Sequence, residues 1–227
     1  MDQKGIRQAI IYGLTPNRLG LCGPQEKHEL LYQWLIKPEK VSLTEVIRTL
    51  ESFQGAYPYY QLIARENRLR DPFAPEVVEA YWLGNKLLDN VSLGNFKKMI
   101  ADKLEKAQFS VPPEAKPHHS FHVLCLRSGL PYELKYLDIC RVGWGKILEI
   151  EGSQALVKYQ PLKEKDGRFF LASSARKTLV FDKKVVPELH TGETVSFHWG
   201  QVCERLTKGQ EKALVYYTSQ SLDLVNR

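Results

Sequence analysis

The segment that decides the fold reads CRVGWGKILEIEGSQALVKY and spans residues 140–159. It consists of two short apolar-rich runs on either side of Gly152 and Ser153, which is the pattern of a β-hairpin. Residues 194–199 alternate small or polar side chains with apolar ones, as a half-buried strand does. Short strands punctuated by glycine predict a small β-barrel in this part of the chain.

Two further runs are predicted to be strands. Residues 169–171 (FFL) follow a charged turn at residues 163–168. Residues 213–217 (ALVYY) lie close to the C-terminus. Both runs fall in the β-rich part of the chain.

The N-terminal part of the chain predicts a small helical domain. Its apolar residues recur at helical spacing, and Ser42 and Ser92 stand where capping residues belong. Ser42 and Glu45 together form the pattern of a capping box. The expected helices cover residues 6–12, 26–36, 43–53 and 57–64, one that begins at Pro75 and one that follows Ser92.

Residues 15–24 (TPNRLGLCGP) hold two prolines and two glycines, so we expect no regular structure there. This segment carries Arg18 and Cys22. One interpretation makes it a binding loop between helices, because loops on a rigid scaffold often carry function. The other interpretation buries Cys22 under a tight turn, which is where a free thiol is commonly found.

A proline-rich stretch marks the predicted domain boundary. Residues 110–117 (SVPPEAKP) contain three prolines, which stiffen the chain and exclude a helix. The sequence therefore predicts an α+β protein with a helical domain at residues 1–110, a linker at residues 111–117 and an OB-like β-barrel domain at residues 118–227.

Three of the six histidines lie directly after this linker, at positions 118, 119 and 122. If the segment is a strand, His118 and His122 point to the same face and could share a metal ion. Imidazole and thiolate suit iron, nickel, copper or zinc, and ligand softness does not choose between them. Histidines that only form hydrogen bonds at a domain junction are the other interpretation, and both stay open.

Composition is that of a soluble globular protein. Among the 227 residues, 43% are hydrophobic and 26% are charged. The longest apolar runs are far below the roughly 18 residues of a membrane span, and no signal-peptide core is apparent. We therefore expect a cytoplasmic protein. The four cysteines are scattered without a CxxC pair, which indicates reduced thiols and neither a disulfide framework nor a zinc knuckle.

The aromatic residues of the helical part allow two interpretations. Tyr57, Tyr59, Tyr60, Tyr81 and Trp82 either line a pocket with arginines at its rim or form the core. The sequence contains no Gly-rich phosphate loop, no GxSxG elbow and no paired-carboxylate spacing. Catalysis by a conventional NTPase or hydrolase is therefore not indicated.

Residues 140–208 resemble the HypC/HupF family of hydrogenase maturation chaperones. The resemblance rests on Cys140 and the glycine-containing run that leads into an acidic-Gly hairpin, on GETVSFHWG at residues 192–200, and on CERL at residues 203–206. In that family the cysteine follows the initiator methionine, whereas here it is internal. Trp144 stands where the family has proline.

This resemblance implies metal-binding roles for two residues. In the family, the matching cysteine and the histidine of a "VHVG" strand are the proposed ligands of an iron atom that bears cyanide and carbon monoxide and passes to the hydrogenase large subunit. By resemblance these roles fall on Cys140 and His198. Residues 15–24 and 57–85 also resemble an uncharacterised bacterial family encoded near nickel-iron hydrogenase genes.

We therefore expect an accessory or chaperone protein of nickel-iron hydrogenase maturation. It would bind an iron centre, the immature large subunit or another maturation protein. The binding surface would be formed by Cys140 and His198, together with His118 and His122. The alternative within this class is a barrel kept as an interaction module after loss of the iron chemistry.

Two functions of other classes stay open. A barrel with a basic patch at residues 176–184 and aromatic residues such as Tyr159 and Phe169 also fits nucleic-acid binding. The net charge of +6 is not concentrated in either half of the chain, which does not favour it. The second function is a small-molecule enzyme with a pocket in the helical domain.

Overall fold

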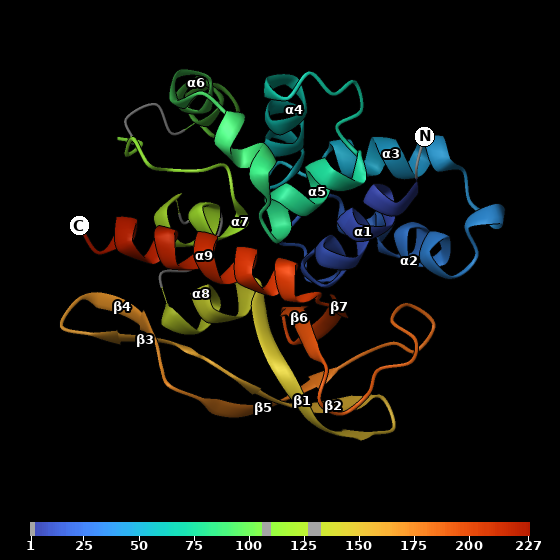
Figure 1. Cartoon of the computed structure of the whole chain (residues 1–227). Coiled ribbons are helices and arrows are strands. Elements are labelled where there is room, and N and C mark those ends of the chain that lie inside the picture. Colours follow the sequence, from blue (N-terminus) through green and yellow to red (C-terminus); the bar gives the residue numbers. More distant parts are fainter. Residues whose placement is uncertain (1–2, 106–109, 127–132) are drawn as a thin grey trace.

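The computed structural model describes residues 3–105, 110–126 and 133–227, and its architecture is α+β (Figure 1). An N-terminal helical region lies against a ring of five strands, and the last helix runs along the boundary between them (Figure 1). The predicted fold class, a helical region followed by a small β-barrel, is confirmed. No helix among the described residues is long and apolar enough to span a membrane.

The predicted N-terminal helices are present, with shifted ends. Pro75 occupies the first turn of its helix, and the Ser92 hydroxyl accepts a backbone amide as a capping residue does. Ser42 caps in the same way, but the Glu45 carboxylate pairs with Lys27 instead of completing the capping box. The helices are α1 (Gln3–Arg18), α2 (His28–Ile36), α3 (Leu43–Glu51), α4 (Tyr57–Glu66), α5 (Pro75–Trp82) and α6 (Leu93–Leu104), with 3-10 turns η1 (Gln25–Lys27), η2 (Pro38–Lys40) and η3 (Lys86–Asn90).

The segment at residues 15–24 is more regular than expected. Helix α1 continues through Pro16 as far as Arg18, so the prediction of irregular structure from residue 15 onward is wrong. Proline lacks a backbone N–H and therefore removes one helical hydrogen bond without ending the helix here. The irregular part begins at residue 19, and within it Gly20 and Gly23 adopt positive φ angles.

The prediction of a strand directly after the linker is wrong. The chain instead forms the short helix α7 (His119–Phe121), one π-helical turn η4 (His122–Leu126) and, further on, α8 (Leu134–Cys140). His118 caps α7, because its Nδ1 accepts the Ser120 amide at 3.1 Å. Helical spacing puts His119 and His122 on one face, with ring centroids 6.3 Å apart, in place of His118 and His122.

The C-terminal segment at residues 213–217 is also helical, so its prediction as a strand is wrong. Helix α9 (Lys208–Val225) begins with a complete capping box in which Thr207 and Gln210 each bond the other's backbone amide. A short apolar run fits either a strand or a buried helix face, and here the capping box favours the helix. The buried residues of α9 are Leu214, Tyr217, Thr218, Ser221, Leu222 and Leu224.

The barrel closes in the strand order β1-β2-β5-β7-β6. The predicted hairpin is confirmed, since Glu151 pairs with Gln154 across Gly152. At Gly143 a Cβ atom would stand 2.3 Å from the Phe197 ring, so only glycine allows this approach of β1 and β6. The strands are β1 (Gly143–Glu151), β2 (Gln154–Tyr159), β5 (Ala175–Val180), β6 (Thr194–His198) and β7 (Gln201–Arg205), and a separate ribbon consists of β3 (Leu162–Lys165) and β4 (Arg168–Leu171).

One continuous apolar core extends from the helical region into the barrel. Trp82 of α5 and Phe197 of β6 both belong to it. Within the predicted linker, Val111 and Ala115 are buried against the same core. The division of the chain into two domains at residues 111–117 therefore stays a prediction.

A buried ion pair holds the end of α8 against the barrel. The Arg141 side chain is 1% exposed and donates two hydrogen bonds to Asp138 Oδ1, at 2.9 and 3.1 Å. The guanidinium also donates to the Gln160 carbonyl, and Asp138 accepts the Leu162 amide at 2.8 Å. These bonds connect the last turn of α8, which carries Cys140, to the segment that follows β2.

We expect Asp138→Ala to destabilise the protein strongly, because it leaves the Arg141 charge buried without its partner. Loss of one member of a buried pair costs about 3–5 kcal/mol, to be measured as the free energy of unfolding in urea. Glu133→Ala is the control: it removes the exposed pair with Lys135 and should cost less than about 1 kcal/mol. Equal losses for the two variants would contradict the assigned role of Asp138.

Candidate metal centre

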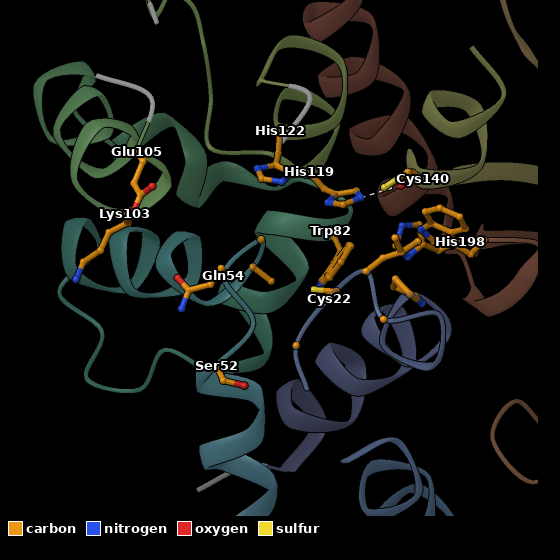
Figure 2. A pocket seen from close by; sticks show the side chains of 17 residues that line it. Cys22, Ser52, Gln54, Trp82, Lys103, Glu105, His119, His122, Cys140 and His198 are labelled. Atoms are coloured by element: carbon orange, nitrogen blue, oxygen red, sulfur yellow. Dashed lines mark hydrogen bonds between the residues drawn. The ribbon is translucent and has the colours of Figure 1, made fainter. Parts of the chain in front are cut away.

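Three potential metal ligands from three elements meet at the junction of the helices and the barrel. They are His119 of α7, Cys140 at the end of α8 and His198 at the end of β6. Their ligand atoms all lie within 4.8 Å of one another, and no second group of this kind occurs in the described part of the chain. Figure 2 shows the three side chains converging.

The group opens onto a cavity of about 520 Å³. Pro16 and Cys22 of the N-terminal segment line this cavity. Trp82, His122 and Trp199 line it as well, and the first two of these are labelled in Figure 2. The cavity thus lies between the helical region and the barrel, which differs from the predicted pocket within the helical domain.

The tautomer of His198 is set by a backbone carbonyl. His198 Nδ1 lies 2.7 Å from the Tyr12 oxygen, and a carbonyl only accepts, so Nδ1 carries the proton. Nε2 therefore bears the lone pair. It is buried and has no hydrogen-bond partner among the residues that the structure describes. A histidine whose outer nitrogen donates to a carbonyl while its inner nitrogen stays free is the usual arrangement of a metal ligand.

The Tyr12 carbonyl is available because of Pro16. In an α-helix the carbonyl of residue 12 would accept the amide of residue 16, but proline has no amide hydrogen. The helix therefore leaves this acceptor without its usual partner, and His198 supplies the missing donor.

His119 lies between two hydrogen-bond acceptors. The Tyr81 hydroxyl lies 2.5 Å from the Gly55 carbonyl and donates its only proton there, so it can only accept from His119 Nδ1, 3.0 Å away. The Cys140 carbonyl beside Nε2 also can only accept. A neutral ring has one proton and donates it to one of these two acceptors.

The contact of His119 Nε2 with the Cys140 carbonyl oxygen is 2.8 Å long. A neutral ring with its proton on Nδ1 has no second proton to donate to this oxygen. Burial, reinforced by neighbouring histidines, lowers the pKa of His119 well below its usual value, so the ring is neutral. A cation bound at Nε2 would require the tautomer in which Nδ1 donates to the Tyr81 hydroxyl.

The thiol of Cys140 is held in its protonated form. Burial raises its pKa to about 12, while the Trp199 indole N–H lowers it. Trp199 Nε1 is itself buried and has no hydrogen-bond partner within the geometric limits among the described residues. A thiol in such surroundings ionises when a metal ion replaces its proton. The Trp199 N–H next to the sulfur would then stabilise the thiolate.

Two imidazole nitrogens and one thiolate are a ligand set for a soft or borderline transition metal. Iron, nickel, copper and zinc all accept it. Three protein ligands leave one position of a tetrahedral ion open, as in catalytic zinc sites.

Only two of the four predicted metal ligands belong to this group. Cys140 and His198 are members, and His119 joins them. His118 is 1% exposed and stacks on Tyr217, and His122 Nδ1 bonds the Tyr59 hydroxyl at 2.9 Å. Metal binding by His118 or His122 stays a prediction. His119 would have been found from the sequence if residues 118–122 had been predicted as a helix.

The aromatic residues of α4 and α5 belong mainly to the core. Tyr59, Tyr60 and Tyr81 are at most 2% exposed, and Trp82 alone among the five aromatic residues predicted for a pocket lines the cavity. The Tyr59 and Tyr81 hydroxyls nonetheless affect the site, because each bonds a histidine.

Fold and site together define an α+β protein with a buried candidate centre for a transition metal. The sequence belongs to the Family of unknown function (DUF6390), whose family model matches residues 1–227. No curated protein and no solved structure matches the chain.

We expect the stability of the protein to fall steeply below pH 6.5. Burial lowers the pKa of His118 to about 3 and those of His122 and His198 to about 4. An unfolded histidine has a pKa near 6.5, so the unfolded chain binds more protons in this window. Each histidine makes its full contribution to the free energy of unfolding above pH 6.5. As the pH falls below this value, each histidine lowers the free energy of unfolding by at most about 1.4 kcal/mol per pH unit.

Urea unfolding between pH 7 and pH 4.5 measures the slope of the unfolding free energy against pH. His118→Asn should make it shallower by about one proton, because the variant lacks one buried neutral ring. The exposed His190 provides the control, and His190→Gln should keep the wild-type slope. A wild-type unfolding free energy that is independent of pH in this window would show that the buried rings are not held neutral.

Pro16→Ala should weaken metal binding while it increases the stability of the fold. Alanine restores an amide that competes with His198 for the Tyr12 carbonyl, so we expect about a tenfold loss of cobalt affinity. The same change favours α1 and should stabilise the fold by up to about 3 kcal/mol. Cobalt titration and thermal unfolding measure the two effects. An unchanged affinity in a more stable variant would mean that Pro16 does not act through His198.

Proposed function

We propose that this protein binds a transition metal ion through His119, Cys140 and His198 and serves as an accessory protein in nickel-iron hydrogenase maturation. One observation carries the proposal. Cys140 and His198, the two residues to which the HypC/HupF resemblance assigns iron ligation, lie far apart in the sequence and yet belong to one group with ligand atoms within 4.8 Å.

The hydrogen bonds around the group support metal binding. His198 keeps Nδ1 protonated through its bond to the Tyr12 carbonyl, so it can offer Nε2 to an ion. His119 can offer Nε2 when its Nδ1 donates to the Tyr81 hydroxyl. A thiolate is a strong donor and suits iron in particular. The cargo in this proposal is an iron centre, and the recipient is the immature large subunit or another maturation protein.

The internal position of Cys140 affects how such a centre would be released. In HypC/HupF proteins the cysteine is at a free N-terminus, whereas Cys140 is held between α8 and β1. The ion pair of Arg141 and Asp138 further restrains it. Release would therefore require exchange of ligands at the cavity instead of withdrawal of the cysteine segment.

A nucleic-acid-binding barrel is a second candidate, supported by a row of basic residues. Lys146 pairs directly with Lys158, and Lys158 pairs directly with Arg176 across β1, β2 and β5. All three side chains are exposed, and like charges in direct register destabilise a sheet. Oligonucleotide binding that weakens steeply with salt would favour this candidate.

A metal-dependent enzyme is a third candidate. It is supported by the three-ligand arrangement next to a cavity of about 520 Å³, which has room for a small substrate. The cavity lies at the junction with the barrel, so this candidate differs from an enzyme whose pocket is confined to the helical region.

We expect the protein, purified without oxygen from a host that expresses its hydrogenase genes, to contain about one iron per chain. Infrared bands in the cyanide and carbonyl stretching region should accompany the iron. Cys140→Ala and His198→Ala should lose both, because each removes a ligand, whereas His190→Ala should retain both. Metal analysis, infrared spectra and co-purification with the large subunit are measured together.

Each outcome of this experiment decides between specific alternatives. Metal-free protein that still co-purifies with the large subunit would leave a protein-binding chaperone without iron chemistry. Zinc or another metal without infrared bands would keep the metal site and remove the link to hydrogenase. Absence of both metal and partner would overturn the proposal.

A further inference from the structure

We propose that Cys22 supplies a fourth protein ligand, a second thiolate, to a metal ion held by His119, Cys140 and His198. This inference rests on the proposed metal site and identifies a residue that neither the resemblance nor the three-residue group includes.

Cys22 lies on the wall of the same cavity, although it comes from the distant segment between α1 and η1 (Figure 2). The wall beside it includes Gly55 and His122. A Cβ atom at Gly55 would stand 3.6 Å from His122 Nε2, and the His122 ring stacks on that of His119 with centroids 6.3 Å apart.

Gly55 links the Cys22 thiol to the three-residue group. A Cβ atom at Gly55 would stand 4.0 Å from Cys22 Sγ. The Gly55 carbonyl accepts the Tyr81 hydroxyl, and this hydroxyl lies 3.0 Å from His119 Nδ1. The residue next to the metal-free thiol thus also holds the Tyr81 side chain that contacts His119.

The backbone that carries Cys22 is fixed in place. Asn17 is fully buried, and its side-chain amide donates to the carbonyls of Cys22 and Pro24, at 3.0 and 2.9 Å. Gly23 has φ +68°, and a Cβ there would stand 2.2 Å from the Phe53 ring. Because this backbone is held, the Cys22 thiol would turn from Gly55 toward a bound ion by rotation about its own Cα–Cβ bond.

The balance of charge favours a second anion. A divalent ion bound by two neutral imidazoles and one thiolate keeps a net charge of +1, and an uncompensated charge in a buried site is costly. Among the residues that line the cavity, the one carboxylate is that of Glu105, which is exposed. A Cys22 thiolate makes the site neutral and gives a Cys₂His₂ ligand set.

The unpartnered nitrogen of His198 is independent evidence that this point is a ligand site. His198 is 2% exposed, and its Nε2 has no hydrogen-bond partner in the described part of the chain. Buried polar atoms without partners are rare, because each loses its bonds to water. Cys22 faces the cavity into which this nitrogen points, so the two observations indicate one site.

Cobalt(II) added to the reduced, full-length protein without oxygen tests the proposal. The sulfur-to-cobalt charge-transfer absorbance reports thiolate ligands. We expect Cys22→Ser and Cys140→Ser each to lose about half of it, as in a site with two sulfurs. The half-buried Cys125 does not line the cavity, and Cys125→Ser is the matched control that should retain the full absorbance.

X-ray absorption of the cobalt protein provides a sulfur count that does not depend on a variant. It should find two sulfur neighbours in the wild type and one in Cys22→Ser. This measurement decides the question even if a serine variant fails to fold, which circular dichroism would reveal.

The outcomes keep this inference separate from the proposed site. One sulfur in the wild type, with unchanged absorbance in Cys22→Ser, would overturn the role of Cys22 and leave the fourth position to water or a small molecule. Failure of the wild type to bind cobalt would overturn the proposed site itself. Two sulfurs that persist in Cys22→Ser would assign the second thiolate to another cysteine and also overturn the inference.

Discussion

The hydrogen bond from His198 Nδ1 to the Tyr12 carbonyl is the contact that connects the helical region, the barrel and the candidate centre. It joins α1 to β6 and at the same time directs Nε2 of the ring toward Cys140. The acceptor is available because Pro16 has no amide to occupy it. The Tyr12 side chain strengthens the same junction, since its hydroxyl bonds Ser196 and Glu204 of the barrel, each at 2.7 Å.

Burial explains the chemical state of the site. Desolvation keeps His119 and His198 neutral and keeps the Cys140 thiol protonated. The same desolvation makes the lone pair of His198 Nε2 costly, because no donor among the described residues reaches it. A bound cation would satisfy this atom, which connects the energetics of the junction with a metal-binding role.

Local sequence signals predicted most of the helices and the hairpin. Pro75, Ser92 and the turn at Gly152 act through their own backbone geometry, so their effects can be read without tertiary structure. The segments 118–125 and 213–217 were predicted as strands and are helical. Their apolar runs are short and fit the periodicity of a strand as well as that of a helix. The contacts that favour the helix are the caps made by His118 and Thr207.

The sequence by itself determined the residue types that suit a soft metal, the positions of Cys140 and His198, and the missing amide at Pro16. Only the tertiary structure decided that His119 is the third member of the group and that Cys22 lines the same cavity. Which ring nitrogen keeps its proton depends on whether a carbonyl or a hydroxyl lies beside it. The Tyr12, Gly55 and Tyr81 groups come from distant parts of the chain, and their meeting point is set by packing of the whole core.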